Sequence, residues 1–217
     1  DHRDLHLSLR RQRQMCIRDS RKQGLIPEQF PCKEYLTYIG LLSEWNKTYN
    51  LTGIKKSEQM ITRHIINSLS AFPYIKGTHC LDVGTGAGLP GIILALAQPE
   101  KKWTLLDSAQ KKIKFLRHIK YEFGMDNIEI IQSRVEQYKP IMEFDTVICR
   151  AFAPLSRLLS QLEHLITSNN QLLAIKGENV ENEYQELSGC NFQIELFDLP
   201  SSDLKAKSKL AKIQRQN

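Results

Sequence analysis

The stretch LDVGTGAGLPGI, residues 81–92, constrains the fold of this chain more than any other part of the sequence. An acidic residue, Asp82, is followed by four glycines in the eight positions from Gly84 to Gly91, and the sequence then turns apolar again. Glycine lacks a β-carbon, so it adopts positive φ angles readily and lets a ligand lie against the main chain. The stretch therefore predicts a tight turn that joins a buried strand to a helix.

Short apolar runs alternate with helical patterns on both sides of this turn. Strands are predicted over residues 79–84, 102–107, 128–133, 144–151 and 171–177, and helices over residues 90–98, 108–124 and 155–166. Such alternation is typical of an α/β fold with a mostly parallel sheet and helices on both of its faces. The tail, residues 191–199 and 204–217, is expected to close the sheet with a hairpin.

The sequence before the turn is helical in pattern. An amphipathic helix is predicted over 34–45, a break over 46–53, and a second helix from 57, with Ser57 as a possible cap, to a stop before Pro73. We therefore expect a basic segment over 1–30, a helical extension over 31–76 and a core domain over 77–217. The basic segment is interpreted as an upstream extension, and a nucleic-acid-binding arm is the alternative.

Composition sets limits on compartment and partners. Lys and Arg outnumber Asp and Glu by 30 to 24, for a net charge of +6, which suits a polyanionic partner but also fits a merely basic protein. The five cysteines are scattered without a CxxC pair, so neither disulfides nor a zinc site is expected. No apolar run approaches the roughly 20 residues that span a bilayer. We expect a cytoplasmic protein that does not enter the membrane.

The glycine turn is expected to bind a nucleoside-containing cofactor, because ligands of open parallel sheets bind beyond the carboxyl ends of the strands. Asp107 ends the next predicted strand, 107 − 84 = 23 residues after Gly84, where its carboxylate can accept hydrogen bonds from ribose hydroxyls. A dinucleotide is disfavoured, since Leu89 replaces the third glycine of GxGxxG and Asp82 would face a pyrophosphate. Asp82 suits the cationic S-adenosylmethionine, and a turn without any ligand is the remaining alternative.

Longer motifs point to one family. The segments LDVGTGAGLPGI, TLLDSAQKKIKFLR, SRVEQY, FDTVICRAFAPL and AIKG, with WNKTYNLT and RHIINSL upstream, closely resemble the bacterial glucose-inhibited division protein B family. The resemblance runs from about Tyr35 to Gly177. It implies a Rossmann-like class I methyltransferase fold, S-adenosylmethionine as methyl donor, and N7 of a guanine in the decoding-region loop of 16S rRNA as acceptor.

The resemblance also implies site residues. The cofactor contacts that it carries over fall on Gly84, Leu89, Val135, Glu136 and Arg150. The general logic of the fold adds Asp82, Gly86 and Asp107 to the same pocket. The basic residues that we expect near RNA are Lys111, Lys112 and Lys176. Two simpler interpretations stay open, a surface pair between Glu136 and Lys139 and a solvated basic helix face around Lys111.

The expected chemistry needs no catalytic side chain. Guanine N7 carries an in-plane lone pair and no proton, so its methylation requires positioning and no general base. No metal is expected either, because His64 and His118 lack carboxylate or cysteine partners at ligand spacing. Two alternatives remain, an RNA-binding assembly factor with a cofactor pocket but no turnover, and a dinucleotide-dependent oxidoreductase. We expect the partner to be 16S rRNA or the small ribosomal subunit, and the protein to be a monomer.

The sequence departs from the family pattern in two places. Asn67 stands where the family usually has Asp, so the resemblance implies no charge role at that position. The tail after Asp198 matches poorly and residues 1 to about 30 do not match. No function is carried over to those regions.

Overall fold

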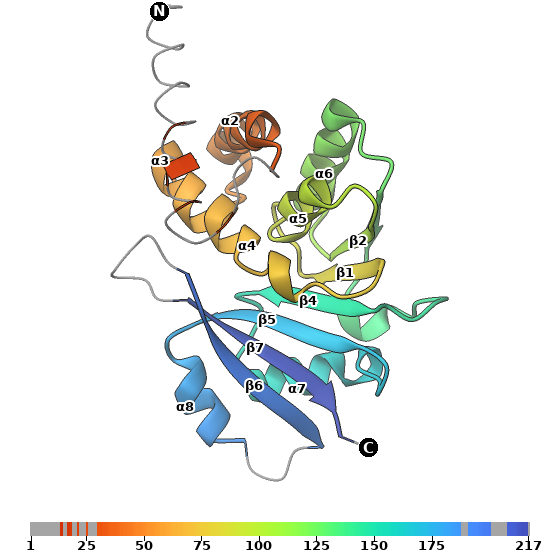
Figure 1. Ribbon diagram of the computed structural model, residues 1–217. Helices are drawn as coiled ribbons and strands as arrows, with labels where there is room; N and C mark the ends of the chain where they lie inside the picture. The colour runs from red at the N-terminus through yellow and green to blue at the C-terminus, as the bar shows by residue number, and fades with distance from the viewer. Residues whose placement is uncertain are drawn as a thin grey trace, which may run out of the picture.

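A computed structural model describes residues 30–187, 191–200 and 208–216, with isolated positions 14, 17, 18, 21 and 25. The predicted basic segment therefore lies almost wholly outside the described residues. The described chain forms one seven-stranded sheet in the order β3-β2-β1-β4-β5-β7-β6 (Figure 1). The strands are β1 (His79–Val83), β2 (Lys102–Asp107), β3 (Ile128–Gln132), β4 (Thr146–Arg150), β5 (Gln171–Gly177), β6 (Phe192–Leu199) and β7 (Ser208–Arg215).

The sheet is mostly parallel, as predicted. Strands β1 to β5 pair in parallel, whereas β7 pairs antiparallel with both β5 and β6, so the predicted hairpin is confirmed. Strand order reverses at β1, which has β2 on one side and β4 on the other. Such a switch point opens a crevice at the carboxyl ends of the strands, which lie on the left of Figure 1.

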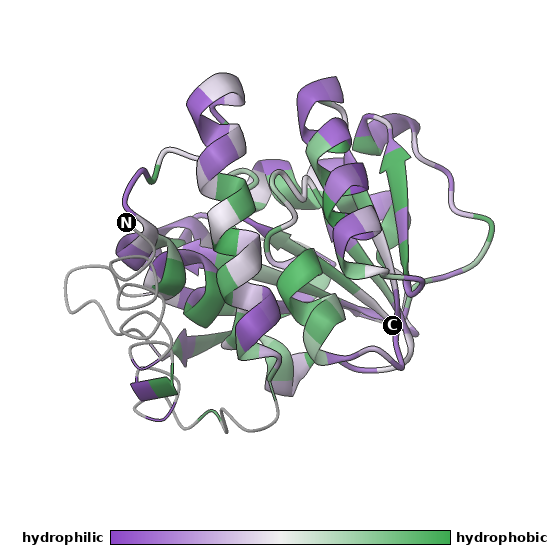
Figure 2. Cartoon of the chain, turned by 90° about the horizontal axis from the view of Figure 1, so that it is seen from above, coloured by the Kyte–Doolittle hydropathy of each residue, from purple (hydrophilic) through white to green (hydrophobic). Residues whose placement is uncertain are grey.

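Helices cover both faces of the sheet (Figure 1). One face carries α2 (Cys32–Tyr49), α3 (Ser57–Met60), η2 (Ile61–Ile66), α4 (Asn67–Leu69), α5 (Gly91–Ala97) and α6 (Gln110–Phe123). The other carries α7 (Leu155–Leu162) and α8 (Val180–Gln185). Short 3-10 turns lie at η3 (Phe72–Tyr74), η4 (Val135–Gln137) and η5 (Glu163–Leu165). Seen from above, hydrophilic and hydrophobic stretches alternate along the helices (Figure 2), as burial of one helix face requires.

Two local predictions were wrong, and two features were not predicted. Helix α2 runs to Tyr49 through the predicted break, because Asn46 is buried and its side-chain oxygen accepts a hydrogen bond from the amide of Thr52 at 2.8 Å. Ser57 is the first helical residue and caps nothing. The second predicted helix contains a π-helical stretch, η2, that apolar periodicity does not reveal. The polar helix α8 was not predicted at all.

The N-terminal helices share one hydrophobic cluster with α5 and α6. Tyr35 and Tyr38 on α2 are fully buried, and their hydroxyls donate hydrogen bonds to the carbonyls of Ile93 at 3.1 Å and Ala87 at 2.7 Å. Because Ala87 belongs to the glycine stretch, α2 fixes the far side of that turn. Among the described residues, no helix is both long and apolar enough to span a membrane.

Candidate functional site

The glycine stretch forms the predicted turn between β1 and α5. Gly84 has a φ of +65°, and a β-carbon there would lie 2.7 Å from the ring of Phe152. At Gly91 an added β-carbon would lie 2.6 Å from the Asp82 carboxylate. Helix α5 can therefore approach β1 closely only because residue 91 has no side chain. Gly84 is required by its positive φ and by the Phe152 ring beside it. Gly91 is required because α5 packs closely against β1 at this position.

Asp82 lies beneath the turn, fully buried. Its Oδ2 accepts hydrogen bonds from the Thr85 hydroxyl at 2.6 Å and from the Gly91 amide at 2.8 Å. Its Oδ1 is buried without a hydrogen-bond partner among the described residues. Burial raises the pKa of Asp82 to about 7, against the opposing effect of these two hydrogen bonds. The carboxylate thus fixes the turn, and one of its oxygens is left unsatisfied.

A cavity of about 390 Å³ opens in front of the turn, at the carboxyl ends of β1, β2 and β4. It brings together five of the predicted cofactor residues: Gly84, Asp107, Val135, Glu136 and Arg150. Three others lie outside its lining: Asp82, Gly86 and Leu89. Leu89 is 4% exposed and packs into the hydrophobic core, so the turn presents its main chain to the cavity and turns this side chain away.

Asp107 is the best-fixed carboxylate of the cavity, with 6% of its surface exposed. Its Oδ2 accepts from the Gly86 amide at 3.0 Å and from Lys112 Nζ at 3.2 Å, and its Oδ1 accepts from the Ala109 amide at 2.9 Å. A carboxylate oxygen accepts about two hydrogen bonds, so Oδ1 keeps a free acceptor direction. This leaves one direction from which a ribose hydroxyl can donate, and the ribose contact that the sequence position of Asp107 suggests stays a prediction.

Arg150 ends β4 and reaches toward the N-terminal helices. Its guanidinium donates to the carbonyl of Arg63 at 2.9 Å and approaches His64 Nδ1 at 3.4 and 3.5 Å. Burial lowers the pKa of Arg150, yet a guanidinium stays protonated in a protein. It is therefore a half-buried, oriented cation at the ligand edge of the sheet.

His64 connects Arg150 to the loop after α2. Its Nε2 lies 2.9 Å from Thr52 Oγ1, and because arginine can only donate, Nδ1 must accept and Nε2 carry the hydrogen. Burial, and secondly the charge of Arg150, lower the pKa of His64 to about 3. Sequence analysis gave His64 no part in the site, since its place in the π-helical η2 cannot be read from the spacing of apolar residues.

The three lysines predicted to lie near RNA differ in their surroundings. Lys112 lines the cavity and pairs with Asp107. Lys111 is exposed, and its Nζ donates to the carbonyl of Tyr49 at 2.8 Å. Lys176 has only 9% of its side chain exposed and forms an ion pair with Glu183 at 2.8 Å. The geometry gives Lys176 a structural partner, so an RNA contact at that position stays a prediction without local support.

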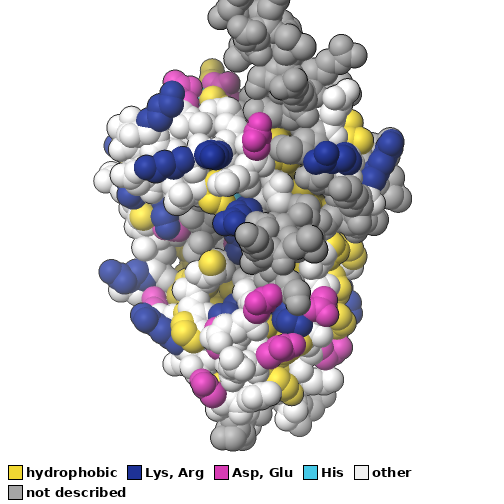
Figure 3. Space-filling model, turned by 90° about the vertical axis from the view of Figure 1, so that its left-hand side faces the viewer, with side chains coloured by type: hydrophobic (Ala, Val, Ile, Leu, Met, Phe, Trp, Pro, Cys, Tyr) yellow, Lys and Arg dark blue, Asp and Glu magenta, His cyan; other side chains and the backbone are white. Residues whose placement is uncertain are grey.

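The cavity contains residues that sequence analysis did not single out, Arg134, Phe152, Arg157 and Gln161. Arg134 and Phe152 fall within the family motifs, but nothing in their spacing marks them as binding residues. The lining holds four cations, Lys112, Arg134, Arg150 and Arg157, against two carboxylates, Asp107 and Glu136. Seen toward the carboxyl ends of the strands, Lys and Arg side chains gather over the upper and left part of the molecule (Figure 3).

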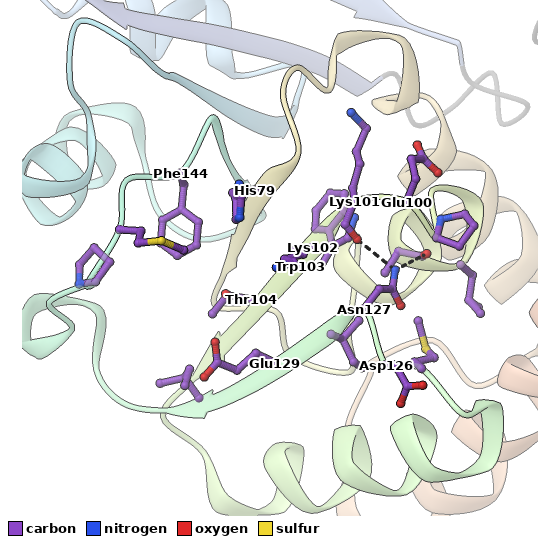
Figure 4. A pocket seen from close by; sticks show the side chains of 18 of the residues that line it. His79, Glu100, Lys101, Lys102, Trp103, Thr104, Asp126, Asn127, Glu129 and Phe144 are labelled. Atoms are coloured by element: carbon purple, nitrogen blue, oxygen red, sulfur yellow. Dashed lines mark hydrogen bonds between the residues drawn. The ribbon is translucent and has the colours of Figure 1, made fainter.

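A second and larger cavity, of about 990 Å³, lies at the opposite edge of the sheet. It is lined by the starts of β1, β2 and β3, the end of α6 and the loop 138–144. Figure 4 shows its side chains, with Asn127 donating to the carbonyls of Ala95 at 3.0 Å and Lys101 at 3.2 Å. Its charged residues are of mixed sign and do not converge on a common point.

The fold and the smaller cavity together define a class of protein. A mostly parallel sheet in this order, with a glycine turn after β1 and a carboxylate at the end of β2, belongs to the Rossmann-like methyltransferases that use S-adenosylmethionine. The solved structure of the Pyrococcus abyssi tRNA (uracil-54, C5)-methyltransferase in complex with S-adenosyl-L-homocysteine shares this fold. The likeness has a TM-score of 0.52 at 18% identity and covers 73% of this chain and 38% of that chain.

The particular family follows from the sequence relatives. The family model described as rRNA small subunit methyltransferase G, GidB, matches residues 32–209. The protein of that name from Shewanella sp. (strain MR-7) is 41% identical over 184 residues, 85% of this chain and 89% of the relative. The one from Legionella pneumophila (strain Corby) is 46% identical over 165 residues, 76% of this chain and 79% of the relative. The chain belongs to this family, as its motifs predicted.

Proposed function

We propose that this protein transfers a methyl group from S-adenosylmethionine to N7 of a guanine in the decoding-region loop of 16S rRNA. The observation that carries the proposal is the cavity at the carboxyl ends of β1, β2 and β4, where a glycine turn, a buried carboxylate and a half-buried arginine meet. The family to which the chain belongs supports the acceptor. A dinucleotide-dependent activity is not favoured, because the relatives are named as methyltransferases.

The residues of the cavity fit the cofactor. Asp107 has an acceptor direction free for a ribose hydroxyl, and Arg150 offers a guanidinium to a carboxylate. Val135 and Glu136 close the side of the cavity toward η4. When bound, S-adenosylmethionine supplies an electrophilic methyl group on a sulfonium. We propose that Gly86 and Leu89 act through the main chain of the turn, and that Asp82 acts by fixing that turn.

The protein side of the reaction consists of positioning. Guanine N7 has no proton to lose, so no residue of the cavity needs to act as a base. The chain has to orient the purine in line with the methyl group and to exclude water from the cavity. The four cations of the cavity lining, Lys112, Arg134, Arg150 and Arg157, draw the phosphates of RNA toward this edge of the sheet, and the exposed Lys111 lies next to Lys112 in the sequence.

We further propose that the protein acts as a monomer in the cytoplasm on 16S rRNA or the small subunit. In this arrangement residues 31–76 serve as an extension that fixes the glycine turn and Arg150 on the core, residues 77–217. The contacts of Tyr38 with Ala87 and of Arg150 with Arg63 support this role.

Methyl transfer from labelled S-adenosylmethionine to free 16S rRNA and to small subunits tests the proposed function. Digestion and mass spectrometry identify the modified base. The expected result is one 7-methylguanine per RNA. Cofactor binding without transfer to either substrate would contradict the proposal and favour an assembly factor without turnover.

A further inference from the structure

The segment between β4 and α7, residues 151–154, is fixed on several sides although it contains no regular structure. The amide of Ala151 donates to the carbonyl of Ile175 at 3.2 Å, and Ala151 has a φ of +48°. A non-glycine residue in this region costs on the order of 1–3 kcal/mol and persists only where its surroundings impose it. The backbone is therefore bent here in a defined way, directly before Phe152.

A buried ion pair fixes the other end of the segment. Lys176 donates to the carbonyl of Ala153, and its partner Glu183 accepts from the amide of Leu155 at 2.8 Å. The pair thus binds one carbonyl of the segment and the amide of the first residue of α7, which explains why a lysine at the end of β5 is largely buried. Its consequence is a fixed position for the ring of Phe152.

Phe152 belongs to the lining of the cavity. Its half-buried ring lies against Gly84 of the glycine turn, which has no side chain in its way. Two exposed arginines, Arg134 before η4 and Arg157 on α7, line the same cavity. Within the described part of the chain, neither guanidinium makes a hydrogen bond or an ion pair, so both are free for an external anion.

We propose that Phe152, Arg134 and Arg157 form the acceptor subsite, in which Phe152 stacks on the purine of a guanine turned out of the RNA and the arginines bind its flanking phosphates. This inference rests on the proposed function and deepens it. Aromatic rings stack on bases of any identity, and arginine forks bind phosphate in a bidentate manner. The combination of one ring and two flanking cations is suited to a single nucleotide within a strand.

The electronic demand of N7 methylation gives Phe152 a second role. The N7 lone pair forms the new bond to the methyl carbon, the carbon–sulfur electron pair stays on sulfur, and the positive charge passes from sulfonium to purine without any proton transfer. The face of an aromatic ring is negative and attracts a cation. Phe152 therefore interacts more strongly with the methylated purine than with guanine, and such a difference accelerates the reaction.

Single-turnover methylation of small subunits by Phe152→Leu and Phe152→Tyr tests the stacking. At saturating cofactor we expect Phe152→Leu to slow transfer roughly ten- to hundredfold, as loss of one stacked base does, and Phe152→Tyr, which keeps an aromatic ring, to slow transfer less than Phe152→Leu does. Cofactor affinity of both variants should match the wild type. A wild-type rate for Phe152→Leu would overturn the subsite.

A binding measurement with the wild-type protein tests the same point without turnover. We expect 7-methylguanosine 5′-monophosphate to bind more tightly than guanosine 5′-monophosphate, and Phe152→Leu to lose this preference. Equal binding of the two nucleotides by the wild type would overturn the inference even if Phe152→Leu does not fold. If the wild type forms no 7-methylguanine in RNA, the proposed function fails, whereas normal methylation by Phe152→Leu refutes the subsite alone.

The arginines are tested by the salt dependence of RNA binding. Arg134→Gln and Arg157→Gln should each weaken RNA binding and lower the slope of log affinity against log salt by about 1, the release of one counterion contact. Lys139→Gln is the matched control, an exposed cation that lines the cavity at the opposite edge of the sheet. Equal slopes for the arginine variants and the wild type, or an equal loss in the control, would overturn the phosphate assignment.

Discussion

The two edges of the sheet carry cavities of opposite character. The cavity at the amino ends of the strands is larger, about 990 Å³ against about 390 Å³ at the carboxyl ends. The smaller one contains Asp107, Arg150 and the bare turn at Gly84. The larger one is a gap between the strand starts and the loop 138–144, where Ile141 is fully exposed. Convergence of fixed polar groups, and not volume, therefore identifies the functional edge.

The largest expected effect comes from filling the turn at the carboxyl edge. Gly84→Val places a β-branched side chain at a φ of +65° and against the Phe152 ring. Because the cavity floor and the ring must both move, methyl transfer should fall by roughly a hundredfold or more, as misplacement by about 1 Å does. The measurement is the initial rate of transfer to small subunits, with RNA binding followed in parallel.

Gly40→Ala on α2 is the matched control for this substitution. No atom lies within 4 Å of the added β-carbon, and its φ is outside the left-handed region, so its activity should equal that of the wild type. Unchanged methylation by Gly84→Val, with intact RNA binding, would mean that the cavity is not the site of turnover.

The second prediction removes the half-buried cation Arg150 from the same edge. Arg150→Ala should lower cofactor or RNA affinity roughly ten- to hundredfold, since a hydrogen bond to a charged group contributes about 1.5–3 kcal/mol. The fold should persist, because the hydrogen bonds of the guanidinium within the described residues go to the carbonyl of Arg63 and to His64. Equilibrium binding of cofactor and of RNA checks both ligands, and normal affinity for both would refute the role of Arg150.

The third prediction concerns pH and His64. The pKa of His64 is about 3 in the folded protein, whereas its ordinary value, which applies to the unfolded chain, is 6.5. The unfolded chain therefore binds the proton more tightly, so the stability contribution is complete above pH 6.5 and is lost as the pH falls toward 3.

His64→Gln keeps an acceptor for Arg150 and has no titrating group. We expect the free energy of unfolding of the wild type to fall relative to that of His64→Gln between pH 6.5 and 4, by up to a few kcal/mol at about 1.4 kcal/mol per pKa unit. Chemical denaturation at several pH values measures it. Parallel pH profiles of the two proteins would show that His64 is not buried as a neutral ring.

The smallest effect is expected at the amino edge. Ile141→Ser and Met142→Ser change exposed side chains of the loop 138–144, and such surface changes usually alter stability by less than about 0.5 kcal/mol. Transfer rates and unfolding free energies should match the wild type. A marked loss of methylation of small subunits would place a substrate contact at this edge and remove the contrast between the two cavities.

The predictability of the two edges from sequence was also unequal. The turn and Asp107 were predicted because glycine angles and strand ends leave a local signature. Arg134 and Arg157 were not, because they meet only through the packing of η4 against α7. His64 joins the site through η2, a π-helical stretch without a distinct apolar spacing. Lys176 was predicted to lie near RNA, and only the position of α8 reveals its partner Glu183.

The fold itself was easier to predict than the site. Strands such as β2 and β5 are continuous apolar runs, because parallel strands are buried on both faces. The end of α2 was harder to predict. An asparagine usually favours the end of a helix, but Asn46 is buried within α2 and its side chain accepts a hydrogen bond from the loop that follows. Tertiary contacts therefore determine where some helices end, which the local sequence preferences do not specify.

The hydroxyls of Tyr35 and Tyr38 have a consequence for how such proteins can diversify. These two groups attach helix α2 to α5 and to the glycine stretch. The N-terminal helices therefore cannot be replaced independently of the rest of the chain. A replacement segment has to supply both phenols in register, or the carbonyls of Ile93 and Ala87 lose these buried partners. The part of the protein that precedes the sheet is thereby inherited together with the turn that it fixes.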